Sequence, residues 1–171
     1  MVAAKREDYG MYRQYVETQI GRIVLEADEQ AVTRLGFPDK GEASQAQENE
    51  VTRQAVRELK EYLAGKRRVF EVALKPVGTA FQEAVWKELC RIPFGEVSTY
   101  GDLAAKVGNP KGARAVGMAL NRNPIMIMVP CHRIIGKNGS LTGFGGGLEA
   151  KKFLLSLEKS DILWKVICNK K

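Results

Sequence analysis

The chain changes character at Lys75-Pro76-Val77-Gly78, and this change limits the folds that it can adopt. Upstream, apolar and polar residues alternate over several short stretches, as in strands that bury one face. Downstream, apolar residues recur with helical spacing in short stretches that glycine and proline separate. A proline-glycine segment between two such patterns is typical of a linker. The sequence therefore predicts two domains, residues 1–78 and residues 79–171.

The first domain is predicted to be a small antiparallel sheet with one helix. Strands are expected at Tyr12–Thr18, Gly21–Glu26 and Ala31–Phe37. Apolar residues three or four positions apart predict an amphipathic helix at Val51–Leu63, which Gly65 would end. A further strand is expected at Val69–Leu74, where β-branched and aromatic residues gather.

The second domain is predicted to be mostly helical. Thr79 followed by Gln82 is a capping-box pattern ahead of its first helix. Thr99 would cap a short helix at Tyr100–Val107, and another is expected at Gly112–Asn121. Two short helices joined by a glycine-containing turn are typical of a helix-turn-helix, although plain helical hairpins look similar from spacing alone.

Three further features complete the second domain. An apolar run predicts a strand at Ile125–Val129, and a glycine-rich turn at 143–147 precedes a last helix at Leu148–Glu158. The glycines would permit close approach of a ligand, although most such turns are only turns. Sheet first and helices second predict the α+β class.

Composition excludes several classes of protein. No stretch approaches the ~18 continuous apolar residues of a membrane helix. The charged N-terminus lacks the apolar core of a signal peptide, so a cytoplasmic protein is expected. Cys90, Cys131 and Cys168 are an odd number without close spacing, and the chain has one histidine. This argues against a disulfide framework and against a structural zinc site, so no metal is expected.

The positive charge is confined to the second domain. Residues 1–78 hold 13 Lys or Arg and 13 Asp or Glu, whereas residues 79–171 hold 14 and 7, so the whole net charge of +7 lies there. Charge in one region favours a polyanion-binding face, although a solvated basic surface would give the same counts.

Cys131 and His132 are adjacent, and Arg133 follows them. A thiolate is the reactive form of cysteine, and a neighbouring base and positive charge favour its formation. If the two side chains cooperate, the backbone must turn here or a water must bridge them, because neighbours on a strand point to opposite faces. A buried structural cysteine beside a surface histidine is the alternative.

Glu158 adds support for a catalytic role of Cys131 and His132 beyond what the adjacent pair gives by itself. It lies on the apolar side of the last helix, four residues after Leu154, and near the C-terminus, where the helix dipole disfavours an acid. A carboxylate in such a position could orient a histidine, and a frayed helix end would also explain it. Cysteine, histidine and an orienting acid together form an activated nucleophile.

The helix expected at Gly112–Asn121 has a single long polar side chain, Arg114, among small residues. A helix that reads bases in the major groove normally carries several long polar side chains. A smooth helix with one arginine suits contact that ignores sequence, with the arginine free to fill space inside a duplex. Tight packing between helices would also select small residues.

The motifs of the second domain together resemble those of the O6-alkylguanine-DNA alkyltransferases. Pro-Cys-His-Arg-Ile, within the segment 123–135, resembles the active-site signature of that family. So do Ala113-Arg114-Ala115-Val116-Gly117, Ile92-Pro93-Phe94-Gly95 and the later Gly-Phe-Gly-Gly-Gly-Leu. The resemblance covers residues 79 to 158, whereas the first domain is compatible with the family without being diagnostic.

The resemblance implies direct-reversal DNA repair. An alkyl group, mainly methyl, would pass from O6-alkylguanine, and from O4-alkylthymine, to Cys131, once per molecule and without a cofactor. The second domain would contain a winged-helix-like helix-turn-helix that binds double-stranded DNA through the minor groove, without sequence preference, and flips the damaged base into a pocket. The protein would be a monomer that joins the nucleoid when bound to DNA.

The resemblance also implies roles for single residues. His132 would act as a base through a water, Glu158 would orient it, and Asn123 would order the reactive loop. Tyr100 would rotate the nucleotide and protonate the leaving base, while Arg114 would fill the gap in the duplex. The expected DNA contacts are Thr99, Gly112, Ala113, Arg114, Ala115, Gly117 and Arg122. The expected pocket residues are Tyr100, Met126, Ile134, Phe144, Gly145 and Gly146, and the backbone of Cys131, Ile134 and Gly145 would read the guanine.

Two departures from the family pattern concern the width of the pocket. Phe144 stands where many relatives have tyrosine, and Gly145 where some have serine.

Three rival functions are less well supported by the sequence. A non-catalytic lesion-binding relative would lack Cys131. A thiol hydrolase would leave the helix-turn-helix and the localised charge unexplained, and a transcriptional regulator would need a further domain.

Overall fold

The computed structural model describes residues 11–42 and 45–158. Its first half is a sheet of three antiparallel strands in the order β1-β2-β3, namely Tyr12–Thr18, Gly21–Ala27 and Val32–Gly36. Thr18 pairs with Gly21, which closes a tight hairpin. Gly21 has a φ of +112°, a backbone conformation that glycine adopts more readily than other residues. The three predicted strands are therefore confirmed.

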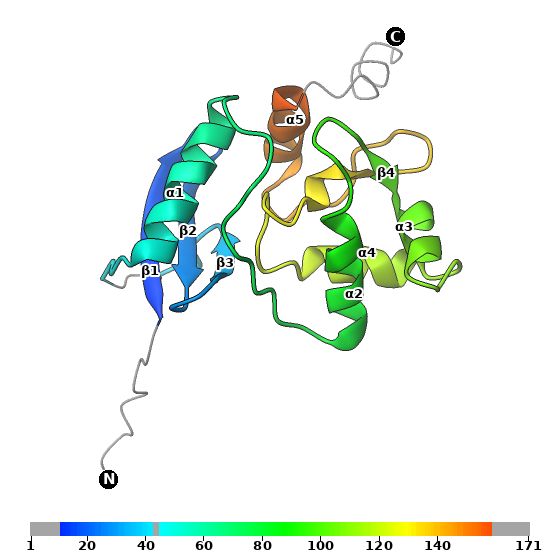
Figure 1. Ribbon diagram of the computed structural model, residues 1–171. Coiled ribbons are helices and arrows are strands. Elements are labelled where there is room, and N and C mark those ends of the chain that lie inside the picture. The colour runs from blue at the N-terminus through cyan, green and yellow to red at the C-terminus, as the bar shows by residue number, and fades with distance from the viewer. Residues whose placement is uncertain (1–10, 43–44, 159–171) are drawn as a thin grey trace.

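Helix α1, Glu50–Leu63, crosses the sheet and covers one face of it (Figure 1). Asn49 and Thr52 form a reciprocal capping box at its start, which satisfies two of the free amides of the first turn. Its apolar stripe buries Ala55 and Leu59 completely against Ile23 and Leu25 of β2. The predicted helix is confirmed.

Helices dominate the second half of the molecule. They are α2 at Ala80–Leu89, α3 at Tyr100–Lys106, α4 at Ala113–Asn121 and α5 at Leu148–Leu157. Thr79 and Gln82 form the predicted capping box of α2, and Thr99 accepts a hydrogen bond from the Asp102 amide at the start of α3. Helices α2, α3 and α4 pack on one another, and Trp86 of α2 donates to the Ala119 carbonyl at 2.9 Å. The helical second domain is confirmed, and its winged character stays a prediction.

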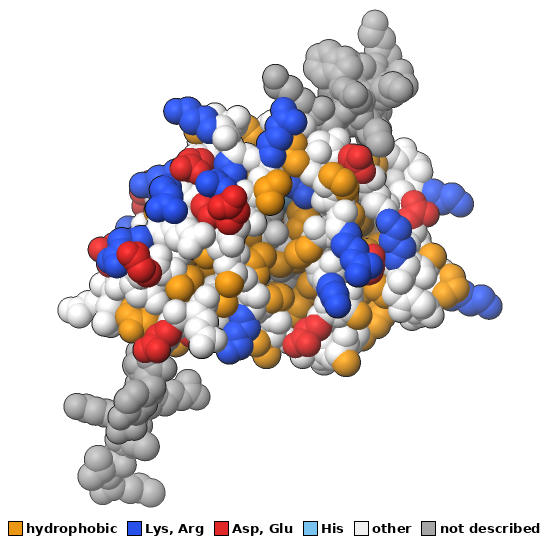
Figure 2. Space-filling model, in the orientation of Figure 1, with side chains coloured by type: hydrophobic (Ala, Val, Ile, Leu, Met, Phe, Trp, Pro, Cys, Tyr) orange, Lys and Arg blue, Asp and Glu red, His pale blue; other side chains and the backbone are white. Residues whose placement is uncertain are grey.

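Both halves contribute to one buried cluster. It includes Leu25 and Leu59 from the first half and Trp86 and Val116 from the second. Apolar side chains also gather in the hollow between the halves, with Lys and Arg on either flank (Figure 2). No helix in the described ranges is long and apolar enough to cross a membrane.

The strand predicted at Val69–Leu74 is wrong. Leu74 alone forms an isolated parallel bridge, to Val32, and the rest of the segment is irregular. The Glu58 carboxylate accepts hydrogen bonds from the amides of Glu71 and Val72, at 2.9 and 3.1 Å. Because a side chain occupies these amides, they are not free to form a ladder with another strand.

The strand predicted at Ile125–Val129 is also wrong. The five residues are fully or almost fully buried but fold as consecutive turns. Ile127 has a φ of +72° and lies between Met126 and Met128, whose carbonyl and amide bond at 2.8 Å. The apolar run was a correct signal of burial, but burial does not distinguish a strand from a turn enclosed between two domains.

Two short strands lie next to the helices of the second half. Strand β4, Ser98–Thr99, pairs in parallel with β5, Ile134–Ile135. Strand β3 reaches across to the buried turns, because the Leu35 amide bonds to the Pro124 carbonyl and the Met126 amide bonds to the Leu35 carbonyl, each at 2.9 Å. The sheet of the first half therefore braces the segment that leads to Cys131.

Candidate active site

Cys131 begins a single turn of 3-10 helix, η1, at Cys131–Arg133. Pro130 precedes it with φ −82° and ψ 64°, and the Cys131 amide bonds back to the Val129 carbonyl at 2.8 Å. These features are those of an inverse γ-turn. The backbone therefore turns at Cys131 and His132 instead of extending. Only 7% of Cys131 is exposed.

Asn123 holds the buried turns ahead of Cys131. Its Nδ2 donates to the Val129 carbonyl at 2.9 Å, and its Oδ1 accepts from the Ile125 amide at 3.0 Å. One side chain thus bridges both ends of the five-residue segment. Its amide also hydrogen-bonds to the Cys131 thiol. The cysteine is thus held by a short, internally bonded loop.

His132 and Glu158 form a buried pair. The His132 Nε2 lies 2.8 Å from Glu158 Oε1, and neither side chain has exposed surface. Glu158 lies at the C-cap of α5, where Leu154 and Leu157 pack beside it in the core. The helix end is ordered, so the frayed end that the sequence left open is not what the structure shows. The structure thus joins the acid to the histidine across 26 residues of chain.

The charge of Glu158 is matched by Arg133. Arg133 donates from Nε to Oε2 at 3.0 Å and from Nη2 to Oε1 at 2.8 Å, and its Nη1 donates to the Ile92 carbonyl at 2.6 Å. Burial raises the pKa of Glu158, but hydrogen bonds from His132 and Arg133 outweigh it and lower the pKa to about 2. The carboxylate is therefore ionised at neutral pH.

An ionised carboxylate can only accept hydrogen bonds, so Nε2 of His132 carries the ring proton. Burial lowers the pKa of His132, so the ring is neutral at pH 7 and Nδ1 bears a lone pair. Among the described residues, no protein group hydrogen-bonds to this buried Nδ1. His132 is therefore poised to accept a proton at that nitrogen.

The groups around Cys131 favour its ionisation, as expected, but burial outweighs them in this structure. Burial raises the pKa of the thiol, and the Asn123 hydrogen bond and the charge of Lys151 oppose that effect only in part. The sequence showed the neighbours of the cysteine but not the depth at which the fold buries it. The thiol is therefore protonated at rest and must lose its proton when it reacts.

Lys151 is a buried charge that sequence reasoning missed. Its side chain is fully buried in α5, and Nζ donates to the carbonyls of Ile134 and Thr142, at 2.5 and 3.1 Å. Burial lowers its pKa to about 8. Lys151, Leu155 and Glu158 are spaced four and three residues apart, so they share one helix face. That spacing, on the face expected to be buried, was the available signal.

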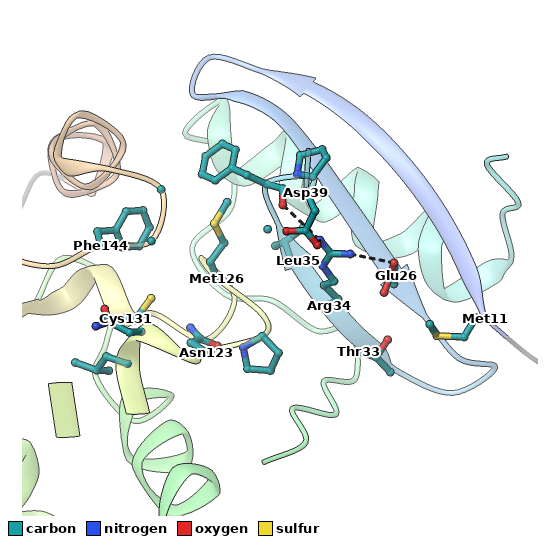
Figure 3. A pocket seen from close by; sticks show the side chains of 18 residues that line it. Met11, Glu26, Thr33, Arg34, Leu35, Asp39, Asn123, Met126, Cys131 and Phe144 are labelled. Atoms are coloured by element: carbon teal, nitrogen blue, oxygen red, sulfur yellow. Dashed lines mark hydrogen bonds and ion pairs between the residues drawn. The ribbon is translucent and has the colours of Figure 1, made fainter. Parts of the chain in front are cut away.

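A cavity of about 690 Å³ opens between the two halves beside Cys131. Figure 3 shows Cys131, Asn123 and Phe144 on one side of it and Glu26, Arg34 and Met11 on the other. Four expected pocket residues line it, namely Met126, Phe144, Gly145 and Gly146. The ring of Phe37, in the first domain, lies so close to Gly146 that an added Cβ would be 2.5 Å from it.

Two expected pocket residues lie elsewhere. Ile134 is completely buried, and Tyr100 is half-buried on α3. The Tyr100 hydroxyl donates to the Thr142 carbonyl at 2.8 Å, and its ring lies near Gly117. Neither residue lines the cavity. Their roles toward a substrate stay predictions.

Helix α4 has both exposed and packed residues among those expected to touch DNA. Arg114 and Arg122 are exposed, Ala113, Ala115 and Gly117 are half-buried, and Thr99 caps α3. Gly112 is buried, and a Cβ there would lie 2.2 Å from the Asn109 side chain. Packing therefore explains Gly112, while the exposed arginines remain available to a ligand.

Fold and site together define a two-domain protein with a buried Cys-His-Glu centre beside a helical unit. Among the described residues, no group of three His, Cys, Asp or Glu could hold a metal ion. Two family models match the chain. Residues 11–76 match "6-O-methylguanine DNA methyltransferase, ribonuclease-like domain", and residues 80–160 match the "DNA binding domain" of the same family.

Individual proteins are similar over nearly their whole length. A methylated-DNA–protein-cysteine methyltransferase of Methanosarcina acetivorans is 49% identical, covering 88% of this chain and 99% of its own. One from Haemophilus influenzae is 46% identical, covering 87% of each. The crystal structure of Mycobacterium tuberculosis OGT in complex with DNA is 42% identical, covers 87% of this chain and 93% of its own, and has a TM-score of 0.79. The chain therefore belongs to the 6-O-methylguanine DNA methyltransferase family.

Proposed function

We propose that this protein repairs DNA by direct reversal. It takes the alkyl group, mainly methyl, from O6-alkylguanine, and also from O4-alkylthymine, onto the sulfur of Cys131. The observation that carries the proposal is the buried thiol next to a histidine whose Nε2 is held by Glu158, so that Nδ1 is free to accept a proton. The names of similar proteins support the same reaction.

The proposed reaction is a direct displacement. A water bridges the thiol to His132 Nδ1 and carries its proton to the ring, and the charge on Glu158 stabilises the imidazolium that forms. The sulfur attacks the alkyl carbon, a carbon–sulfur bond forms and the carbon–oxygen bond breaks. Tyr100 supplies a proton to the leaving guanine. Because the thioether is stable, each molecule reacts once, and the step needs no cofactor.

The damaged base must leave the duplex to reach a buried thiol. We propose that α4 lies in the minor groove, with Arg114 filling the space that the flipped nucleotide leaves. Thr99 and Arg122 would contact the backbone, which has the same chemistry at every sequence, so no sequence preference is expected. The protein would act as a monomer, on chromosomal DNA in the cytoplasm. The exposure of both arginines supports this arrangement.

The cavity beside Cys131 is proposed to receive the flipped base. Phe144 and Met126 supply apolar walls, and Gly145 can offer only backbone groups. Phe144 has no hydroxyl and Gly145 no side chain, so the mouth of the pocket is wider than tyrosine and serine would leave it. This favours tolerance of groups larger than methyl.

The test is to weigh the protein after reaction with a duplex containing one O6-methylguanine. We expect a gain of one methyl group per chain, located on the peptide that holds Cys131. Cys131→Ser should lose the transfer and keep DNA binding, whereas the matched control Cys90→Ser, at an exposed thiol, should keep both. Repeated turnover, or DNA binding without any gain in mass, would contradict the proposal.

A further inference from the structure

Tyr62 joins the first half of the molecule to the centre around Cys131. It lies on α1, its side chain is fully buried, and its hydroxyl is 2.6 Å from Glu158 Oε1. The same hydroxyl is 3.4 Å from His132 Nε2. Phe70 and Phe94 hold its ring, with ring centroids 5.2 and 6.1 Å away. A residue 96 positions away in the sequence thus touches the carboxylate that holds the histidine.

The direction of this hydrogen bond follows from the charges. Glu158 is ionised and can only accept, so the Tyr62 hydroxyl donates to it. Burial and the nearby carboxylate both raise the pKa of Tyr62, so the hydroxyl keeps its proton. His132 Nε2 also donates to Oε1, and therefore the close approach of Tyr62 and His132 reflects two donors that share one acceptor.

Because several donors share one acceptor oxygen of Glu158, they compete for it. Oε1 receives Tyr62, His132 Nε2 and Arg133 Nη2 at 2.6, 2.8 and 2.8 Å. Each donor withdraws electron density from the carboxylate, so each weakens the attraction of Glu158 for the proton on Nε2. A weaker attraction leaves the ring less basic at Nδ1. The tyrosine also helps to position Oε1, because Phe70 and Phe94 pack against its ring.

We propose that Tyr62 is a positioning residue through which the first domain sets the basicity of His132, and with it the readiness of Cys131 to react. The inference rests on the proposed function. It assigns the first domain a chemical role in the reaction beyond bracing the fold. Tyr62 itself would touch neither DNA nor the alkyl group.

Other groups around His132 also affect its charge. The charged or titratable groups are Cys131 and Arg133 on η1, Lys151 and Glu158 from α5 and its cap, Tyr62 from α1, and Cys90 at the end of α2, which faces Arg133. Lys151 and Arg133 disfavour the imidazolium, whereas Glu158 favours it. Tyr62 differs from Lys151, Arg133 and Glu158 because it is uncharged, so removing its hydroxyl changes a hydrogen bond and leaves the net charge of the site unchanged.

The test uses Tyr62→Phe, which removes one oxygen and keeps the ring. Loss of the donor strengthens the hold of Glu158 on the Nε2 proton, so the pKa of His132 should rise by about 0.5 to 1 unit. His132 is the only histidine in the chain. The ring NMR signals of isotope-labelled histidine can therefore be followed through pH without other histidines. The acid limb of the single-turnover rate of methyl transfer should move to higher pH by the same amount.

Phe70→Leu is the control for packing. It loosens the aromatic contact of Tyr62 and leaves the hydroxyl in place, so thermal stability should fall without an equal shift in the titration. In the unaltered protein, the neutral ring should carry its proton on Nε2. A ring protonated on Nδ1, no shift in Tyr62→Phe, or equal shifts in both variants would overturn the inference.

The experiments can refute the inference about Tyr62 and the proposed function independently of each other. The titration of His132 needs no substrate, so it tests Tyr62 even if no methyl group is transferred. If the unaltered protein accepts methyl and Tyr62→Phe has an unchanged pH profile, the inference about Tyr62 fails and the proposed function stands. If no methyl is accepted, the proposed function fails regardless of the titration, and with it the consequence for Cys131.

Discussion

Glu26 and Glu158 are two buried glutamates that the fold uses differently. Glu26 lies on β2, lines the cavity and pairs with Arg13 and Arg34, which are about a quarter exposed and also contact Glu42. Glu158 is enclosed and pairs with one arginine, one histidine and one tyrosine. The arginines around Glu26 keep their charge at all ordinary pH values, whereas His132 can change its charge. The first site is thus suited to holding a structure, and the second to moving a proton.

The difference between the two glutamates is tested most strongly by removing the negative charge of each in turn. Glu158→Gln leaves Arg133 buried without a counter-ion, which should cost about 3 to 5 kcal/mol of unfolding free energy. The rate of methyl transfer should fall by about 10²-fold or more, because the base loses its orienting partner. Urea unfolding and single-turnover assays measure the two effects.

Glu26→Gln is the matched change at the other site. Arg13 and Arg34 keep Glu42 as a partner and are partly solvated, so the expected loss is about 1 kcal/mol. Equal losses of stability in the two variants would show that the two carboxylates do not differ in the way proposed.

The dependence of stability on pH should sharpen the contrast. The pKa of Glu158 is lowered from 4.5 to about 2, so its contribution, on the order of 3 kcal/mol, is present above pH ~4.5 and lost as the pH falls toward 2. The pKa of His132 is also lowered by burial, so protonation of the unfolded chain should reduce stability once the pH falls below about 6.5. Unfolding in urea at several pH values would show both steps.

A substitution can isolate the decline in stability that begins below about pH 6.5. His132→Asn removes the only histidine, so the decline in stability between about pH 6.5 and 5 should disappear while the later decline remains. A stability that stays constant from pH 7.5 to 5 in the unaltered protein would contradict the burial of a neutral histidine.

The effect expected at Lys151, whose ammonium group donates to two backbone carbonyls, is smaller than that at Glu158. Lys151→Met removes the charge and keeps most of the volume, but leaves the carbonyls of Ile134 and Thr142 without this donor. The expected cost is about 1 to 3 kcal/mol, with faster hydrogen exchange around Thr142. The pKa of the Cys131 thiol should rise further, because the Lys151 charge now lowers it. Thiol titration against Lys152→Met, an exposed neighbour, provides the control.

Local patterns predicted most of the regular structure. The hairpin, α1 and the capping box of α2 depend on residues close together in the chain, so period and capping rules found them. Glu158 was identified because it conflicted with a local rule, as an acid on the apolar side at a helix C-terminus. The two wrong strands failed because a distant side chain, Glu58, and an asparagine bridge, Asn123, satisfied the backbone in other ways.

The rest of the site depends on distant contacts. Nothing near Tyr62 in the sequence indicates that its hydroxyl meets Glu158, and the motif that contains Arg133 does not show that Glu158 is its partner. The ionisation of Cys131 was misjudged for the same reason, because burial depends on the whole fold. Single-sequence patterns therefore singled out Cys131, His132 and Glu158, which the structure brings together, but not the environment that sets their charge.

The buried cluster shared by the two halves has a consequence for how the molecule comes apart. The linker is itself packed, since a Cβ on Gly78 would lie 2.5 Å from the Trp86 ring. Separating the halves would break the hydrogen bonds between Leu35 and the turns before Cys131 and expose that apolar segment to water. The halves should therefore melt in one cooperative transition, and a protease cut at the linker should leave two pieces that stay associated and migrate as one particle.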